Sequence, residues 1–141
     1  MREAFGGIMN LFIIAMFLVL LSSTFALIVN YTKAFKMKNS VISNFEKYEG
    51  NCRSEDTPCV EQIIKEANVM AYSPSVAINC PSGFDSVANR FCYKLESTNS
   101  RGVVYEVVTQ VDIDFPFINR LMGLRVFQVS GKTRLIRTIT T

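Results

Sequence analysis

Two patterns of apolar residues follow one another over the first 50 residues of the chain. Residues 8–29 are 22 consecutive residues without a formal charge. As a helix this segment would be about 33 Å long, enough to cross a hydrocarbon core of about 30 Å. A cleaved secretory signal usually has a shorter apolar region, of about 7–15 residues, with a basic stretch before it. We therefore predict a retained transmembrane anchor over residues 1–29, with cleavage near residues 22–26 as the alternative.

An amphipathic segment follows this anchor. Residues 30–50 contain no proline, and no glycine before Gly50. Their apolar side chains recur at helical spacing, and these are Tyr31, Ala34, Phe35, Val41, Ile42, Phe45 and Tyr48. The pattern predicts that the anchor helix continues over residues 30–50 and ends near Gly50, a residue type that suits a helix C-terminus. We expect this stripe to pack on the chain's own domain, and part of it, or the membrane half, to pack on neighbouring copies.

Residues 51–141 have the pattern of a small α+β domain. Asp56, Thr57 and Pro58 form a helix start with a capping side chain and a proline in the first turn. The spacing i, i+3, i+4, i+7 then predicts a helix over residues 58–71, from the positions Val60, Ile63, Ile64 and Ala67. Residues 79–90 contain Pro81, Ser82, Gly83 and Asp85, and they predict a loop.

The rest of the domain alternates with period two, the pattern of an antiparallel sheet with one polar face. Phe91, Tyr93 and Leu95 begin the first strand, and residues 99–102 supply a turn. The second strand has one apolar face (Val103, Tyr105, Val107, Val111, Ile113, Phe115) and one polar face (Glu106, Gln110, Asp112, Asp114). A last strand over about 124–137 breaks phase between Val126 and Phe127, and Gly131 interrupts it, which predicts a bulge. Together these patterns predict a three- or four-stranded antiparallel meander with helix 30–50 across its apolar face.

Four cysteines bear on the chemistry of this domain: Cys52, Cys59, Cys80 and Cys92. A small domain with a limited core gains about 2–4 kcal/mol from each disulfide, and four cysteines allow three pairings. We favour Cys52–Cys59 and Cys80–Cys92, because each pair flanks a local loop. There is no C-x-x-C motif and no histidine, so a metal site or a nucleophilic cysteine has little support.

Composition and charge exclude several function classes. The chain has 141 residues, 49% of them hydrophobic, and a formal net charge of +3, which is too small and too scattered to predict nucleic-acid binding. The lack of histidine removes most catalytic triads. Asp112 and Asp114 are a close carboxylate pair, but without a glycine-rich loop or further acids they are better explained as a solvated strand face than as a calcium site. We expect no enzymatic activity and no cofactor.

Two signals for the orientation of the anchor disagree. Lys33, Lys36 and Lys38 follow the apolar run, and the positive-inside rule would therefore place the domain in the cytoplasm. Four cysteines in a small domain instead indicate an oxidising compartment. We give the cysteines more weight, because a basic cluster can also contact lipid headgroups. The expected topology is a single-pass protein of the cell membrane with a cytoplasmic N-terminus and an extracytoplasmic domain.

A few residues of the anchor could hold neighbouring helices together. Asn10, Ser22, Ser23 and Thr24 could donate hydrogen bonds to another helix, or equally to their own backbone. The pair Gly6 and Gly7 would allow close approach of two backbones, or would form a flexible lead-in. These six residues are our candidates for subunit packing.

This layout resembles the type IV pilin-like proteins, and within them the TadE-like minor pilins (pseudopilins) of tight-adherence pili. The resemblance lies in the start, MREAFGGIMNLFIIAMFLVLL, and in the end, VDIDFPFINRLMGLRVFQVSGKTRLI. Pilin-like chains usually carry a glutamate five residues into the mature helix, whereas this chain has Leu11 and Phe12 at that offset from the glycine pair, and its only early acid is Glu3.

The resemblance implies a structural subunit of a pilus or secretion-type envelope apparatus. Its implied partners are the lipid membrane, other pilin-like subunits and assembly platform proteins, and the chain could form part of an extracellular filament. A different class of function remains as the alternative: a monomeric, membrane-anchored adaptor or sensor whose domain binds a soluble partner.

Overall fold

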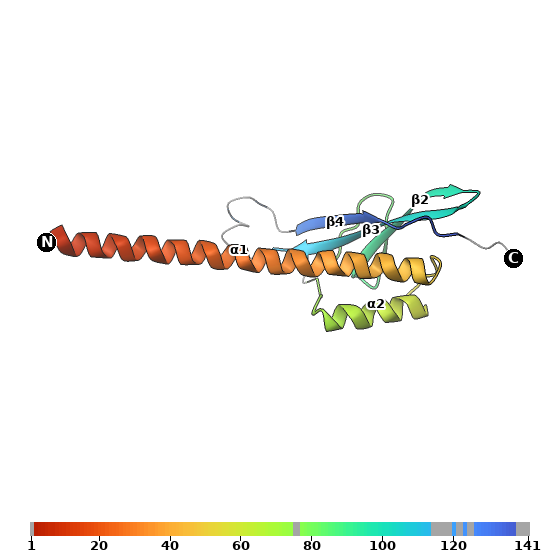
Figure 1. Ribbon diagram of the computed structural model, residues 1–141, viewed down its shortest axis with the longest axis horizontal. Coiled ribbons are helices and arrows are strands. Elements are labelled where there is room, and N and C mark those ends of the chain that lie inside the picture. Colours follow the sequence, from red (N-terminus) through yellow and green to blue (C-terminus); the bar gives the residue numbers. More distant parts are fainter. Residues whose placement is uncertain (1, 75–76, 114–119, 121–122, 124–125, 138–141) are drawn as a thin grey trace.

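The computed structural model has an α+β fold in which one long helix lies between a sheet and a second helix (Figure 1). It describes residues 2–74, 77–113, 120, 123 and 126–137. The elements in chain order are α1 (Arg2–Lys47), α2 (Pro58–Val69), β1 (Asp85–Val87), β2 (Phe91–Asn99), β3 (Gly102–Asp112) and β4 (Val126–Lys132). The predicted fold class is confirmed.

Helix α1 is continuous over 46 residues, as the absence of proline in this segment predicted. It ends at Lys47, slightly before the expected Gly50. The chain leaves the helix through a left-handed turn in which Glu49 has φ 52° and Gly50 has φ 79°. The Gly50 amide donates to the Phe45 carbonyl at 2.8 Å, which satisfies one of the carbonyls that a helix end exposes.

The four strands form an antiparallel meander in the order β1-β2-β3-β4. Strand β1 lies within residues 79–90, which were predicted to form a loop, so this prediction was wrong in part. Three residues are too few to show the alternating pattern of a strand. The register shifts between Leu95 and Ser97, and Leu95, predicted to face the core, is 46% exposed. This register shift in β2 was not predicted.

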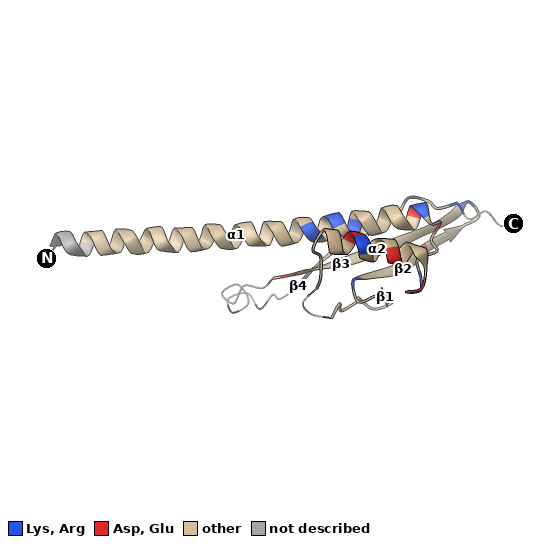
Figure 2. Ribbon diagram, turned by 90° about the horizontal axis from the view of Figure 1, so that it is seen from below, with Lys and Arg blue, Asp and Glu red and all other residues tan. Residues whose placement is uncertain are grey.

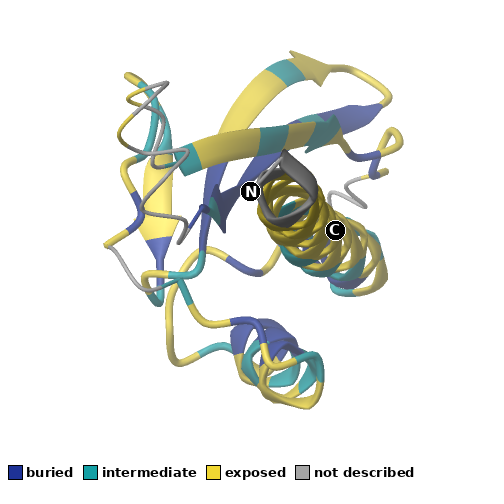
Figure 3. Ribbon diagram, turned by 90° about the vertical axis from the view of Figure 1, so that its left-hand side faces the viewer, coloured by how far each residue is buried: buried dark blue, intermediate teal, exposed yellow. Residues whose placement is uncertain are grey.

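Strand β4 pairs with β3 without interruption from Val126 to Lys132. Neither the phase break after Val126 nor Gly131 disturbs this ladder. Continued pairing would place Val103 opposite Leu135, but Val103 bridges Ile136 instead. The irregularity thus lies beyond Lys132. Figure 3 shows the sheet curving around α1 on one side while α2 lies on another.

The core fills the space between α1, α2 and the inner face of the sheet. Helix α1 contributes a stripe of fully buried residues at spacings of three and four: Ala34, Met37, Val41 and Phe45. The Phe45 ring meets Phe91 edge-on with centroids 6.0 Å apart, and lies 5.4 Å from Tyr105. The predicted stripe was wrong in part, because Tyr31 and Phe35 are 50% and 42% exposed.

The outer face of the sheet is less solvated than its polar pattern predicted. Gln110 is only 2% exposed, and Val108 forms a second apolar cluster with Ile78 and Cys92. The Gln110 side chain accepts from the Asn79 amide at 3.3 Å, so the chain before β1 covers this part of the outer face. Of the predicted carboxylate pair, Asp112 is half-buried at the end of β3, and Asp114 lies outside the described residues.

The cysteines lie in the two pairs that the sequence favoured. Cys52 and Cys59 have Cα atoms 5.3 Å apart, and Cys80 and Cys92 have Cα atoms 5.7 Å apart, both within disulfide geometry. The first pair joins the end of the α1 turn to the start of α2, and the second joins the outer-face loop to β2.

Helix α2 begins at Pro58 after Thr57 and ends at Val69, two residues before the predicted end. The Thr57 side chain does not form the expected capping hydrogen bond at this helix start. The Thr57 hydroxyl donates to the Ser54 carbonyl at 2.8 Å, whereas a capping side chain would accept from an amide of the first turn.

Gly102 provides a test of the turn between β2 and β3. Its φ is 150°, and a Cβ there would lie against the backbone carbonyl of Ile136, which accepts from the Val103 amide at 2.8 Å. Gly102→Ala should therefore lower the free energy of unfolding by about 2–3 kcal/mol, measured by urea titration of the full chain in detergent micelles with near-UV circular dichroism.

Gly83→Ala is the matched control, because Gly83 has φ 84° but only the Lys94 side chain nearby, at 3.8 Å. It should cost about 1 kcal/mol, the contribution of the backbone conformation alone. Equal losses for the two variants would show that the contact with Ile136 contributes nothing.

Candidate assembly site on the long helix

The N-terminal half of α1 extends beyond the domain (Figure 1), and it carries exposed apolar side chains on all sides. Every large apolar side chain from Ile8 to Leu21 is at least 41% exposed. The helix is long and apolar enough to cross a membrane, and none of its most apolar window is buried by the rest of the protein. Figure 2 shows no charged ribbon on the described part of this half before the cluster of lysines at the domain. These properties are compatible with a single-pass anchor.

The three hydroxyl residues near the middle of α1 bond their own helix. Ser22 and Ser23 both donate to the Val19 carbonyl, at 3.0 and 2.8 Å, and Thr24 donates to the Leu21 carbonyl at 2.8 Å. Of the two possibilities that the sequence left open for them, the structure has the internal one. Since each hydroxyl has one proton, none is left to donate to a neighbouring helix in this arrangement.

Gly6, Gly7 and Asn10 form the strongest part of the predicted packing set. Both glycines are inside α1, so they are not a flexible lead-in, and a Cβ at either would meet nothing within 4 Å. They precede Asn10 by four and three residues and share its face of the helix. At about 100° per residue, Ser22 and Ser23 point about 120° and 140° away from Asn10. Thr24 points only about 40° away from Asn10, so its hydrogen bond to the Leu21 carbonyl, and not its face of the helix, sets it apart from this group.

Where α1 reaches the domain, its surface changes from apolar to mixed. Asn30 is half-buried, and its amide donates to the Asp112 carbonyl at 3.3 Å. Tyr31 and Phe35 stack on each other outside the core, with centroids 6.4 Å apart, and the Lys38 ammonium lies 4.2 Å from the centre of the Phe35 ring. An aromatic pair beside lysines is typical of the membrane–water interface.

The C-terminal half of α1 is fixed to both of its neighbours by polar contacts. The Thr109 hydroxyl of β3 donates to the Ala34 carbonyl at 3.1 Å. On the other side, the Glu66 carboxylate of α2 accepts from the Ser40 hydroxyl and from the Asn44 amide, the latter at 3.2 Å. Gln62 adds a third hydrogen bond to Glu66 at 3.0 Å.

The hydrogen bond from Ser40, with further ones from Gln62 and Asn44, holds the pKa of Glu66 below its usual value. Sequence reasoning missed this junction. Glu66 is 26 residues from Ser40 and 22 from Asn44, and no spacing rule links residues on two different helices.

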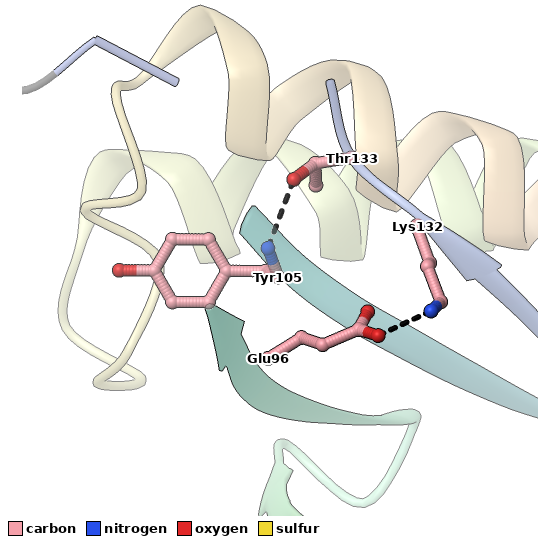
Figure 4. A network of polar contacts seen from close by, with 4 residues as sticks. All are labelled: Glu96, Tyr105, Lys132 and Thr133. Carbon is pink, nitrogen blue, oxygen red and sulfur yellow. Dashed lines mark hydrogen bonds and ion pairs between the residues drawn. The ribbon is translucent and has the colours of Figure 1, made fainter. Parts of the chain in front are cut away.

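Polar contacts also join strands β2, β3 and β4 and the residue that follows β4 (Figure 4). The Thr133 hydroxyl accepts from the Tyr105 amide at 3.0 Å, and Lys132 of β4 pairs with Glu96 of β2 across β3. Beside α1, a Cβ on Gly131 would lie 2.9 Å from the Ile42 side chain. The sheet therefore lies close against the helix, and the domain and the C-terminal half of α1 form one packed unit.

Within the described residues, no three His, Cys, Asp or Glu side chains lie close enough together to hold a metal ion. No family model matches the chain, and the comparisons with curated proteins and with solved structures gave no match. A proposal for the function therefore rests on the properties of α1.

The junction at Glu66 predicts a pH-dependent contribution to stability. Because the pKa of the folded state is lowered, this contribution is complete above the unfolded pKa and is lost as the pH falls through the folded pKa. Glu66→Gln should reduce the free energy of unfolding by about 1 kcal/mol at pH 7. The difference from the natural chain should be constant above the ordinary glutamate pKa and should shrink as the pH falls through the lowered pKa of the folded state, as measured by urea titration at a series of pH values.

Glu61→Gln is the control, since it removes the same charge from an exposed position on α2, where Glu61 pairs with the equally exposed Lys65. It should change stability much less than Glu66→Gln at pH 7. A deficit for Glu66→Gln that is the same at every pH would contradict an ionic contribution.

Proposed function

We propose that this chain is a membrane-anchored structural subunit of a pilus or secretion-type envelope apparatus, similar to the TadE-like minor pilins. Its N-terminal helix would cross the membrane and assemble beside the helices of other pilin-like subunits. The observation that carries the proposal is the division of α1 into two halves. Residues 34–45 bury a stripe in the domain, whereas the large apolar side chains of residues 8–21 are exposed on all sides.

A lone helix in a membrane could satisfy these apolar side chains with lipid, so assembly needs a further argument. Within lipid, helices associate through close van der Waals fit and a few polar bonds. Gly6 and Gly7 leave the helix surface open beside Asn10, and among the described residues the Asn10 side chain forms no hydrogen bond. An unbonded amide at the edge of the hydrocarbon layer gains from a hydrogen-bond partner on another helix.

The proposed orientation places the N-terminus in the cytoplasm and the domain outside. The two disulfide pairs support it, because such bonds persist in oxidising compartments. Lys33, Lys36 and Lys38 would then contact headgroups of the outer leaflet rather than mark the cytoplasmic side.

In-membrane photocrosslinking tests where the subunits associate. A photoreactive phenylalanine analogue at Phe12 or Phe17, inside the proposed span, should crosslink one copy of the chain to another or to related subunits in native membranes. Asn10→Leu or Gly7→Leu should weaken this association by about three- to tenfold, while the domain stays folded. The double variant Ser22→Ala/Ser23→Ala is the matched control, and it should retain the crosslinks because both hydroxyls bond their own helix.

The same analogue at Phe127, which is 43% exposed on β4, reports on the sheet. Crosslinks confined to this position, or none at either site, would favour the anchored adaptor or sensor over the pilin-like subunit.

A further inference from the structure

A shallow groove of about 340 Å³ lies at the junction of the apolar half of α1 with the domain. It is formed by one face of α1 and by the residue that follows α2, and its lining consists of Ile28, Val29, Thr32, Lys33, Lys36 and Met70. The apolar residues come from the end of the proposed span. The two lysines lie one and two turns further along the same helix.

The two lysines give the groove a positive charge, with one described carboxylate residue, Asp112, lining the adjoining pocket beside Lys33. Within the described part of the chain, neither Lys33 nor Lys36 forms a salt bridge. Side chains on a helix lean toward its N-terminus, so both lysines are directed toward the apolar half. A site with apolar side chains at one end and two ammonium groups at the other suits an amphipathic anion.

The position of the groove along α1 identifies that anion. With Val29 at the edge of the hydrocarbon, Lys33 lies about 6 Å and Lys36 about 10 Å further along the helix axis. The headgroup layer of one leaflet is about 5–8 Å thick. Lys33 therefore lies within the headgroup layer. Lys36 begins just outside this layer, and the lean of its side chain toward the helix N-terminus brings its ammonium group back to the boundary.

Helix α2 adds an apolar surface at the same level. Its C-terminal end lies toward the apolar half of α1 (Figure 1), and Met70 there lines the groove. The neighbouring Val69 is 88% exposed, although the opposite side of α2 is buried in the core. An exposed valine beside a methionine at the membrane-proximal end of the domain is placed to contact the interfacial region of a bilayer.

We propose that this groove binds the phosphate headgroup of an anionic phospholipid, and that Val69 and Met70 enter the interfacial layer beside it. The bound lipid would hold the end of α2 on the membrane and fix the tilt of the whole domain. The inference rests on the proposed membrane anchor, but it does not require association with other subunits.

Tryptophan fluorescence can test this contact, because the chain has no tryptophan. The full chain with Val69→Trp is placed in lipid nanodiscs at one copy per disc, with phosphatidylcholine brominated close to the headgroup as the quencher. Adding phosphatidylglycerol should increase the quenching. Lys33→Gln/Lys36→Gln should then lower the ratio of docked to free domain by about thirtyfold, since each lysine near an anionic surface contributes about fivefold.

Two controls accompany the measurement. Lys47→Gln/Lys94→Gln removes the same charge from two exposed lysines outside the groove, and it should leave the quenching unchanged. Leu135→Trp places the fluorophore beside Glu46 and Glu49, near the opposite end of the packed part of α1, where quenching should be weak.

Three results would overturn the proposal. Quenching at position 69 no stronger than at position 135 would show that the groove does not reach the lipid. Quenching that is the same with and without Lys33→Gln/Lys36→Gln would exclude a headgroup site. A signal that appears only with two copies per disc would mean that a second chain fills the groove. Crosslinks at Phe12 could persist in each of these cases, so this failure is distinguishable from failure of the proposed function.

Discussion

An apolar helix that its own domain does not cover must find another apolar environment. The first half of α1 exposes isoleucine, leucine, phenylalanine and methionine side chains on every side. Transfer of such surface from water to lipid contributes about 25 cal/mol per Å², and a fully bonded helix also satisfies its backbone polar groups there. The domain is built on the remainder of this helix, so the environment of the first half determines where the domain lies.

The second half of α1 is packed between the sheet and α2. Its buried stripe is narrow, from Ala34 to Phe45, and the sheet and α2 cover that stripe from two sides. Thr109 and Glu66 then fix the helix to both neighbours. A domain attached in this way cannot swing about a flexible linker, so the tilt of the anchor and the orientation of the sheet are linked. In the proposed anchored state, the lysines and the end of α2 would lie where this link meets the lipid surface.

The sequence predicted the large elements because their signals are long. An uncharged run of 22 residues, a continuous helical stripe and a period-two strand each repeat many times. The failures lie where a signal is short or comes from elsewhere in the chain. Strand β1 has three residues, and Leu95 leaves the core because a register shift follows it. Tyr31 and Phe35 matched the helical period, but the width of the stripe depends on what covers it. The junction at Glu66 depends on the packing angle of two helices, which no local pattern encodes.

The central claim is that the apolar half of α1 remains part of a protein whose domain lies in an oxidising compartment. The most direct test is the intact mass of the chain extracted from native membranes and alkylated without reduction. We predict a mass that retains residues 1–29 and carries no alkyl group, because Cys52, Cys59, Cys80 and Cys92 are paired. A chain that begins after about residue 26, or one with four alkylated cysteines, would contradict the account.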